Sequence, residues 1–143
     1  MRILVDTNVL LDYILLREPF TQSAQKIIKL CQEEILNGAM AAQSVPDMFY
    51  ILRKNISIEE RRRILYCLCD IFHVENIDKD KLQRALPNQD FRDFEDCLQM
   101  ECAASFKADY IITRNIDDYA SSNIPCVTPK AFCDMLETKG QEV

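Results

Sequence analysis

Four aspartates stand where an α/β chain could use carboxylates for chemistry. They follow short apolar segments or lie on a helix-forming segment, and they are Asp6, Asp47, Asp96 and Asp118. Carboxylates that converge repel one another unless cations lie between them. Oxygen ligands without histidine or cysteine select Mg²⁺ or Mn²⁺, and such ions promote phosphodiester hydrolysis by activating water. The pattern therefore predicts a metal site lined by acids.

Two of these aspartates also have simple structural explanations. Asp6 comes directly after Ile3–Val5 and could be the N-cap of a following helix, because aspartate accepts hydrogen bonds from free backbone N–H groups. Asp47 completes the pattern Ser-Val-Pro-Asp that begins at Ser44, which is typical of a capping box. At both positions the structural and the functional interpretations stay open.

Asp96 is more informative, because helical geometry places it on one stripe with Met100 and Ala103. We expect this stripe to face the sheet, and Glu95 and Gln99 to face solvent. A buried carboxylate is costly without a partner. Asp96 therefore needs either a salt bridge or a metal ion.

A polar turn follows the apolar segment Asp109–Ile112 and contains Thr113, Asn115 and Asp118. A turn rich in asparagine and aspartate needs no function. The first predicted strand is followed in a similar way by Asp6–Asn8. In both places hydroxyl and amide side chains lie beside an acid. The repetition favours a shared site.

Arg114, in the same turn, is the candidate contact for a substrate phosphate group. The net charge of −6 repels phosphate groups, so binding a phosphodiester substrate would need a local positive strip. Arginine suits this role because its planar fork can grip two phosphate oxygens. The alternative is that Arg114 forms an ion pair with Asp117 or Asp118 in the turn.

Short apolar strands alternate with helical segments along the chain. Strands are expected at Arg2–Val5, Ala39–Ala42, Phe72–Val74, Asp109–Ile112 and Pro125–Val127. Helices are expected from Thr7 or Asn8 to Leu15, from Thr21 to near Asn37 and Gly38, from Ser44 to Leu52, from Ser57 to Cys69, from Asp78 to Leu86, from Asp93 to Phe106, and from Pro129 to about Leu136. This alternation predicts a three-layer α/β/α sandwich with a central parallel sheet of about five strands, whose ligands bind beyond the carboxyl ends of the strands.

The composition excludes several other classes of protein. At 143 residues, we expect a single domain over residues 1–138 and a frayed tail over residues 139–143. Two glycines cannot build a P-loop or a dinucleotide-binding fingerprint, and the single histidine, His73, reads as a structural strand residue. Seven scattered cysteines indicate reduced thiols rather than zinc ligands. No apolar run is long enough for a membrane span, so we expect a cytoplasmic protein.

The four acidic segments, in this order and spacing, resemble the sequence blocks of the PIN-domain family of metal-dependent ribonucleases, in particular its small bacterial toxin-like (VapC-type) members. The blocks are Ile3–Asp12, Ala42–Asp47, Asp93–Gln99 and Ile111–Tyr119. Asp47 stands where the family usually has glutamate, and Asn115 stands where many members have aspartate. Asn115 brings no charge, so the resemblance implies weaker metal affinity, especially at a second ion site.

The resemblance implies a role for each matching residue. It implies catalysis by Asp6, Asp47, Asp96 and Asp118, with Mg²⁺ or Mn²⁺ held by Asp6, Asp96 and Asp118, and with support from Asn8, Asp93, Thr113 and Asn115. It also implies an RNA substrate, whose backbone Arg114 would contact, a small antitoxin protein as inhibitor, and a homodimer.

Two other functions compete with the ribonuclease. The first is a PIN-fold scaffold that binds RNA or protein with little or no nuclease activity, toward which the Asp47 and Asn115 departures would be early steps. The second is a phosphatase of the haloacid-dehalogenase type. That family requires an aspartate two residues after its nucleophile, and Asn8 at this position argues against it.

Overall fold

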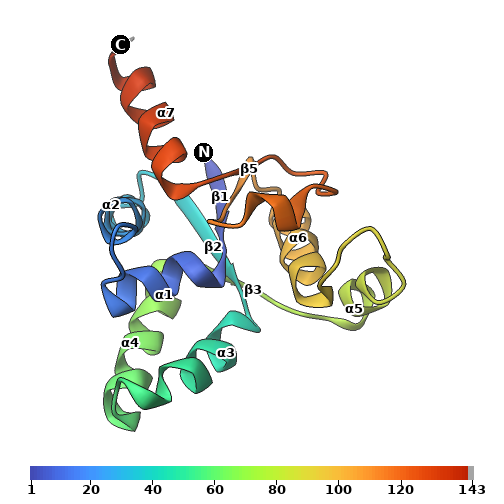
Figure 1. Cartoon of the computed structure of the whole chain (residues 1–143), viewed down its shortest axis with the longest axis horizontal. Helices are drawn as coiled ribbons and strands as arrows, with labels where there is room; N and C mark the ends of the chain where they lie inside the picture. Colours follow the sequence, from blue (N-terminus) through green and yellow to red (C-terminus); the bar gives the residue numbers. More distant parts are fainter. Residues whose placement is uncertain (142–143) are drawn as a thin grey trace.

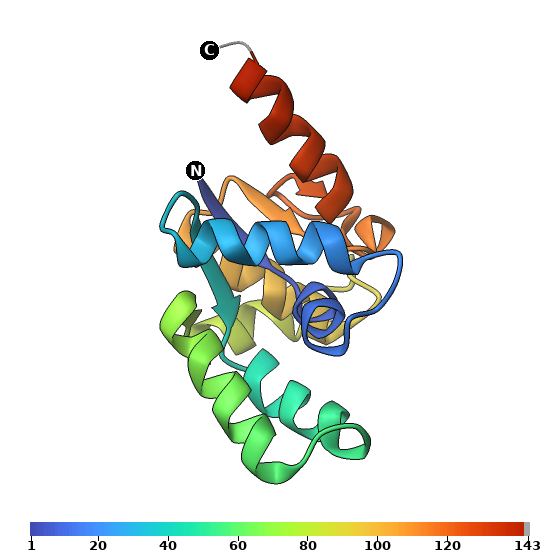
Figure 2. The ribbon, with the colours of Figure 1, turned by 90° about the vertical axis from the view of Figure 1, so that its left-hand side faces the viewer.

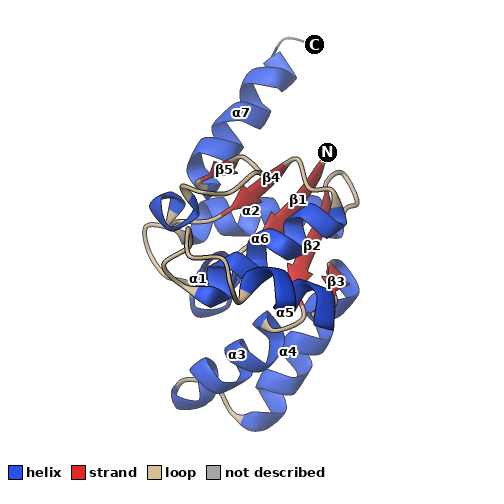
Figure 3. Cartoon of the chain, turned by 90° about the vertical axis from the view of Figure 1, so that its right-hand side faces the viewer, coloured by secondary structure: helices blue, strands red, loops and turns tan. Residues whose placement is uncertain are grey.

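The computed structural model describes residues 1–141 and has a five-stranded, all-parallel sheet at its centre. In chain order the strands are β1 (Arg2–Val5), β2 (Asn37–Ala41), β3 (His73–Glu75), β4 (Tyr110–Ile112) and β5 (Cys126–Val127). Across the sheet their order is β3-β2-β1-β4-β5, so the first strand lies in the middle. Because all the strands are parallel, their carboxyl ends meet at one edge of the sheet (Figure 3).

Helices cover both faces of this sheet, which confirms the three-layer prediction. The helices are α1 (Thr7–Leu15), α2 (Thr21–Gln32), α3 (Ser44–Ile51), α4 (Ile58–Ile71), α5 (Lys79–Ala85), α6 (Phe94–Phe106) and α7 (Pro129–Gln141), with 3-10 turns η1 (Leu52–Lys54) and η2 (Ile116–Tyr119). In Figure 1, α1, α2 and α4 lie on one side of the sheet, and α5 and α6 lie on the other. Helix α7 extends away from the sheet beyond its contact with α2 (Figure 2).

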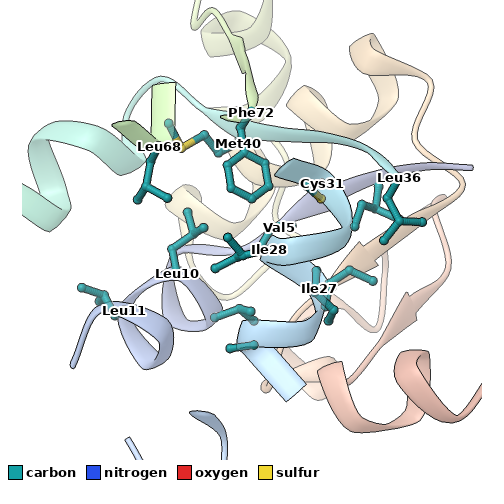
Figure 4. Close-up of a cluster of buried hydrophobic side chains, with 14 of the residues drawn as sticks. Val5, Leu10, Leu11, Ile27, Ile28, Cys31, Leu36, Met40, Leu68 and Phe72 are labelled. Atoms are coloured by element: carbon teal, nitrogen blue, oxygen red, sulfur yellow. The ribbon is translucent and has the colours of Figure 1, made fainter. Parts of the chain in front are cut away.

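Alternating side chains of the strands divide the core into two parts. On β1, Ile3 and Val5 point toward α1 and α2, whereas Leu4 points toward α6. Figure 4 shows the first part, where Val5, Ile28 and Phe72 are drawn among the side chains of the α1 and α2 layer. A sheet buried on both faces requires this pattern, and it fixes the face on which each strand residue lies.

The predicted end of the second helix was wrong. Helix α2 ends at Gln32, and Glu34 then adopts a positive φ of 61°, which breaks the helical path. Gly38 does not end a helix but lies inside β2. A Cβ atom built on it would lie 2.7 Å from the Cys31 sulfur and 2.9 Å from the Phe72 ring, so the glycine allows α2 and the residue before β3 to approach the strand.

The last helix also runs further than the sequence suggested. Helix α7 continues to Gln141, into the segment over residues 139–143 that was expected to fray; Glu142 and Val143 lie outside the described residues. None of the helices within residues 1–141 is long and apolar enough to cross a lipid bilayer.

Candidate active site

A cleft of about 510 Å³ opens beyond the carboxyl ends of the strands, where α1, α3 and α6 begin. Three of the predicted catalytic residues line it, namely Asp6, Asp47 and Asp96. The supporting residues Asn8 and Asn115 line it as well. The structure therefore brings residues from separate sequence segments to one cleft, at the edge that the parallel sheet predicts.

Asp6 has its carboxylate at the floor of the cleft, with only 7% of the residue exposed. It is the N-cap of α1, as the structural interpretation predicted, and its Oδ1 accepts a 2.7 Å hydrogen bond from the backbone N–H of Thr7. Its Oδ2 accepts bonds from the Thr113 hydroxyl at 2.8 Å, the Tyr119 hydroxyl at 3.1 Å and the Asn8 amide at 3.3 Å. All of these donors are neutral, so none of them compensates the charge of Asp6.

Asp96 faces the same cleft from the first turn of α6. No lysine or arginine within residues 1–141 forms an ion pair with it, so the salt-bridge interpretation is wrong. Burial raises the pKa of Asp96 to about 7, and the negative charges of Asp6, Asp118, Asp93 and Glu95 add to the shift. Burial likewise raises the pKa of Asp6, against the hydrogen bonds that it accepts, and Asp118 contributes in the same direction. The cleft therefore concentrates negative charge that the protein does not neutralise.

Asp118 and Asp93 act on the cleft through charge. Neither side chain lines it, but Asp118 raises the pKa of both Asp6 and Asp96, and Asp93 raises that of Asp96. Thr113 is fully buried behind Asp6 and supports it directly through its hydroxyl group.

Asp47 lies on the outer wall of the cleft, in the first turn of α3, and is exposed. Its capping-box interpretation was wrong. Gln43, rather than Ser44, is the N-cap of α3, and no side chain caps this helix. The Ser44 hydroxyl instead lies 2.8 Å from that of Thr7, across the cleft floor.

Gln99 was expected to face solvent, and this was also wrong, because only 3% of the residue is exposed. Its amide nitrogen donates to the hydroxyl groups of Thr7 at 3.2 Å and Ser44 at 3.1 Å, so one side chain of α6 links α1 to α3. Its Oε1 is buried without a hydrogen-bond partner in the described structure. The three-residue spacing between Asp96 and Gln99 could have indicated that Gln99 faces the cleft, since residues i and i+3 of a helix lie on neighbouring parts of its surface.

Tyr119 is a second residue that the sequence did not single out for the site. It is 3% exposed, its ring packs edge-on against Phe91, and its hydroxyl donates to Asp6. Burial and the charges of Asp6 and Asp96 raise its pKa, so the hydroxyl keeps its proton and remains a donor. Its position within the polar turn gave no indication of this inward orientation.

Arg114 points away from the acids of the cleft. Its Nε lies 2.7 Å from Oδ2 of the fully buried Asp12, and its Nη2 donates to Asp12 Oδ1 at 3.2 Å. The guanidinium also lies 4.2 Å from the centre of the Phe20 ring. The expected alternative, an ion pair with Asp117 or Asp118, was therefore wrong. The contact between Arg114 and RNA stays a prediction, and the guanidinium group that would make this contact is paired with Asp12.

The donor set of the cleft fits a hard cation. Within residues 1–141, no three histidine, cysteine, aspartate or glutamate side chains form a ready-made metal cage. Mg²⁺ does not require one, because it commonly takes one or two carboxylates and keeps several water ligands. Asp6 and Asp96 offer two carboxylates in one open cleft, their charges are uncompensated, and their neighbours offer oxygen rather than sulfur.

Residues 2–117 match the family model described as PIN domain. A comparison with curated proteins finds no matching sequence.

Several solved structures share the fold. A toxin-antitoxin complex from Klebsiella pneumoniae has 24% sequence identity and a TM-score of 0.65, over 88% of this chain and 96% of that chain. VapBC2 from Rickettsia felis, bound to a DNA fragment from its promoter, has 14% identity and a TM-score of 0.63, over 90% and 98%. VapBC-1 from nontypeable Haemophilus influenzae has 17% identity and a TM-score of 0.61, over 91% and 99%. At these identities the likeness establishes a common architecture.

Proposed function

Because the chain belongs to the PIN domain family, we propose that it is a metal-dependent endoribonuclease that hydrolyses RNA phosphodiester bonds in the Asp6–Asp96 cleft. The observation that carries the proposal is the uncompensated charge of these two carboxylates. Both pKa values are raised, and only neutral donors hold Asp6. A site built in this way is unfavourable for the protein alone but suits a bound cation.

In this proposal Asp6 and Asp96 hold Mg²⁺ or Mn²⁺, and Asp118 strengthens the negative field around the ion. When bound, the ion activates water and stabilises the charge of the transferring phosphoryl group. The hydroxyl groups of Thr113 and Tyr119 fix the orientation of the Asp6 carboxylate. The buried amide of Gln99 fixes the position of Thr7, next to Asp6.

Asp47 is the candidate proton acceptor. It is exposed on the cleft wall, so its carboxylate can reach a water molecule above the floor. The water oxygen forms the new bond to phosphorus, its proton passes to Asp47, and the bridging ribose oxygen leaves with the bonding electron pair and is then protonated. Aspartate is shorter than the glutamate usual in this block, so we expect this step to be slower than with glutamate.

We also propose a protein partner. The similar structure from Klebsiella pneumoniae is a toxin-antitoxin complex, and this chain aligns with nearly the full length of the matching protein there. By this analogy the chain is the toxin of such a pair and is inhibited by an antitoxin protein. From the sequence resemblance to the small toxin-like members of the family, we further propose that it acts on RNA in the cytoplasm and forms a homodimer.

The deciding experiment is cleavage of single-stranded RNA by the purified protein in Mg²⁺, Mn²⁺ or EDTA. We expect cleavage that EDTA abolishes and that Asp96→Asn lowers by at least about 100-fold, because a ligand to the ion is lost. Asp134→Asn is the matched control, since this aspartate lies on α7, outside the cleft. This variant should cleave RNA at the wild-type rate.

Calorimetry adds a readout that does not depend on turnover, because Asp6→Asn should sharply weaken Mg²⁺ binding. Cleavage that survives EDTA, or equal rates for Asp96→Asn and wild type, would overturn the proposal. RNA binding without cleavage in either metal would favour the scaffold alternative.

A further inference from the structure

A large aromatic side chain stands at the mouth of the cleft. Tyr50 lies near the end of α3, is 63% exposed, and lines the same cleft as Asp6 and Asp96. Ile51, which follows it, also lines the cleft and is 42% exposed. The acidic floor of the cleft is thus flanked by exposed apolar side chains that are not part of the hydrophobic core.

Arg53 covers one face of the Tyr50 ring. The centre of its guanidinium lies 3.7 Å from the ring centre, and its Nη1 donates a 2.9 Å hydrogen bond to the backbone carbonyl of Tyr50. Both contacts come from one turn of chain, so they restrict the ring without burying it. Since the guanidinium occupies one face, the high exposure of Tyr50 comes from the rest of its side chain.

The charge of the protein makes such a surface useful. With a net charge of −6, contacts to phosphate groups are opposed by the field of the molecule. Stacking of a nucleobase on an aromatic ring needs no charge and is available to every base. Arg53 adds one local cation beside the ring.

We propose that Tyr50 is a substrate-binding residue that stacks an unpaired base of the RNA. This inference rests on the proposed nuclease function, because it adds a substrate contact to the same cleft. Bases in a duplex are stacked on one another and cannot reach a side chain in this way, whereas a single strand can turn a base outward. Arg53 then has the separate role of contacting phosphate.

The test is binding of a single-stranded RNA that carries one 2-aminopurine, measured in EDTA, followed by cleavage kinetics in Mg²⁺. Stacking quenches the fluorescence of 2-aminopurine, so the signal reports the contact itself. We expect Tyr50→Ala to weaken binding by about 5- to 150-fold and to remove the quenching, and Tyr50→Phe to restore both. In Mg²⁺, the KM of Tyr50→Ala should rise by a similar factor with a smaller change in kcat.

Two further variants separate stacking from charge and from exposure. Tyr66→Ala is the matched control, because Tyr66 is 72% exposed on α4, outside the cleft. This variant should bind RNA with wild-type affinity. Tyr50→Ala should leave the salt dependence of binding unchanged. Arg53→Gln should instead reduce its slope by about one counterion.

The outcomes distinguish this inference from the proposed function. If wild type cleaves RNA and Tyr50→Ala keeps its affinity and KM, the stacking role is overturned and the nuclease stands. The stacking role is also overturned if Tyr50→Phe binds as weakly as Tyr50→Ala. If no metal supports cleavage but Tyr50→Ala still loses binding and quenching, the nuclease proposal fails and the stacking contact stands.

Discussion

Two buried carboxylates lie at the carboxyl ends of parallel strands of the same sheet, yet the charges that act on them have opposite signs. Asp6 comes directly after β1 and is 7% exposed, and Glu75 is the last residue of β3 and is 8% exposed. Burial penalises both charges. What separates them is the set of groups that faces each carboxylate.

Glu75 is surrounded by groups that stabilise its charge. Its Oε1 accepts from the Ser105 hydroxyl at 2.6 Å and from Lys81 Nζ at 3.3 Å, and its Oε2 lies 2.9 Å from His73 Nε2. Burial alone would raise the pKa of Glu75, but these hydrogen bonds and the Lys81 charge outweigh it and lower the pKa. Lys81, itself 2% exposed, is further held by the backbone carbonyl of Asn76 at 2.7 Å.

Asp6 accepts four hydrogen bonds but faces no cation among the described residues, and the charged groups that act on it are acids. The difference shows that burial does not identify a functional carboxylate. The balance of charge around it does, because a compensated acid holds the fold together, whereas an uncompensated acid is a cost that a ligand can remove.

We expect the largest effect on stability at Glu75, the carboxylate whose charge is compensated. Lys81→Met keeps the volume of the buried stem but leaves Glu75 without its cation, so it should lower the free energy of unfolding by about 3–5 kcal/mol. Urea unfolding measures this, with Lys79→Met as control, because that lysine is exposed in the same helix.

The dependence on pH provides a second check on Lys81. Because the folded-state pKa of Glu75 lies below its ordinary value of 4.5, the stabilisation is full above that pH and is lost as the pH falls through the folded-state pKa. The cost of Lys81→Met should therefore be full at pH 7 and shrink below pH 4.5. A cost under about 1 kcal/mol at pH 7 would mean that the pair contributes no more than a surface ion pair.

At the cleft, where the acids are not compensated, we expect a smaller change in stability of the opposite sign. Asp96→Asn removes one charge from the cleft, so in the absence of metal it should raise the free energy of unfolding by about 0.5–2 kcal/mol at pH 8. The folded-state pKa of about 7 lies above the ordinary value of 3.8, so the ionised form is the unfavourable one in the folded protein. The gain should therefore be full above pH 7 and disappear as the pH falls toward 4.

Asp70→Asn is the control for this measurement, because Asp70 is exposed on α4 and should show neither the gain nor its pH dependence. Destabilisation by Asp96→Asn would instead show that Asp96 holds the fold together, and the contrast with Glu75 would fail.

Much of the fold followed from local patterns in the sequence. The bounds of strand β1 were predicted correctly, and helix α1 begins at Thr7, one of the two starts that were predicted, because an apolar run ends at Asp6 and a helix cap begins there. The end of α2 was missed because Gly38 serves a close approach between distant segments rather than a local turn. Patterns within one segment carry no information on such an approach.

Of the four acids predicted for the candidate site, Asp6, Asp47 and Asp96 line one cleft and Asp118 does not, and the contacts between side chains could not be predicted. Asp6 and Asp96 stood out because carboxylates interrupt apolar surroundings. The partners of Arg114 and Gln99 depend on which helix faces meet across the sheet, and a single sequence does not encode these distances locally. For the same reason nothing in the sequence joined Lys81 to Glu75, which was expected to lie just beyond its strand.

The smallest effect should come from the neutral link at the floor of the cleft. Gln99→Met has a similar volume but removes the amide that donates to Thr7 and Ser44, whose hydroxyl groups can still bond to each other at 2.8 Å. Loss of these neutral hydrogen bonds should lower the free energy of unfolding by about 0.5–1.5 kcal/mol. It removes no charge, so this cost should not change between about pH 5 and pH 8, unlike the effect of Asp96→Asn.

Turnover separates a positioning role from a purely structural one. Gln99 ties α1, whose N-cap is Asp6, to α6, which carries Asp96. Its loss should therefore lower kcat by about 10-fold through misplacement of the two carboxylates, with KM little changed. Gln83→Met, at an exposed position of α5, should alter neither quantity. If Gln99→Met loses stability but keeps its kcat, the amide only packs the floor, and Asp6 and Asp96 are held in place by their own helices.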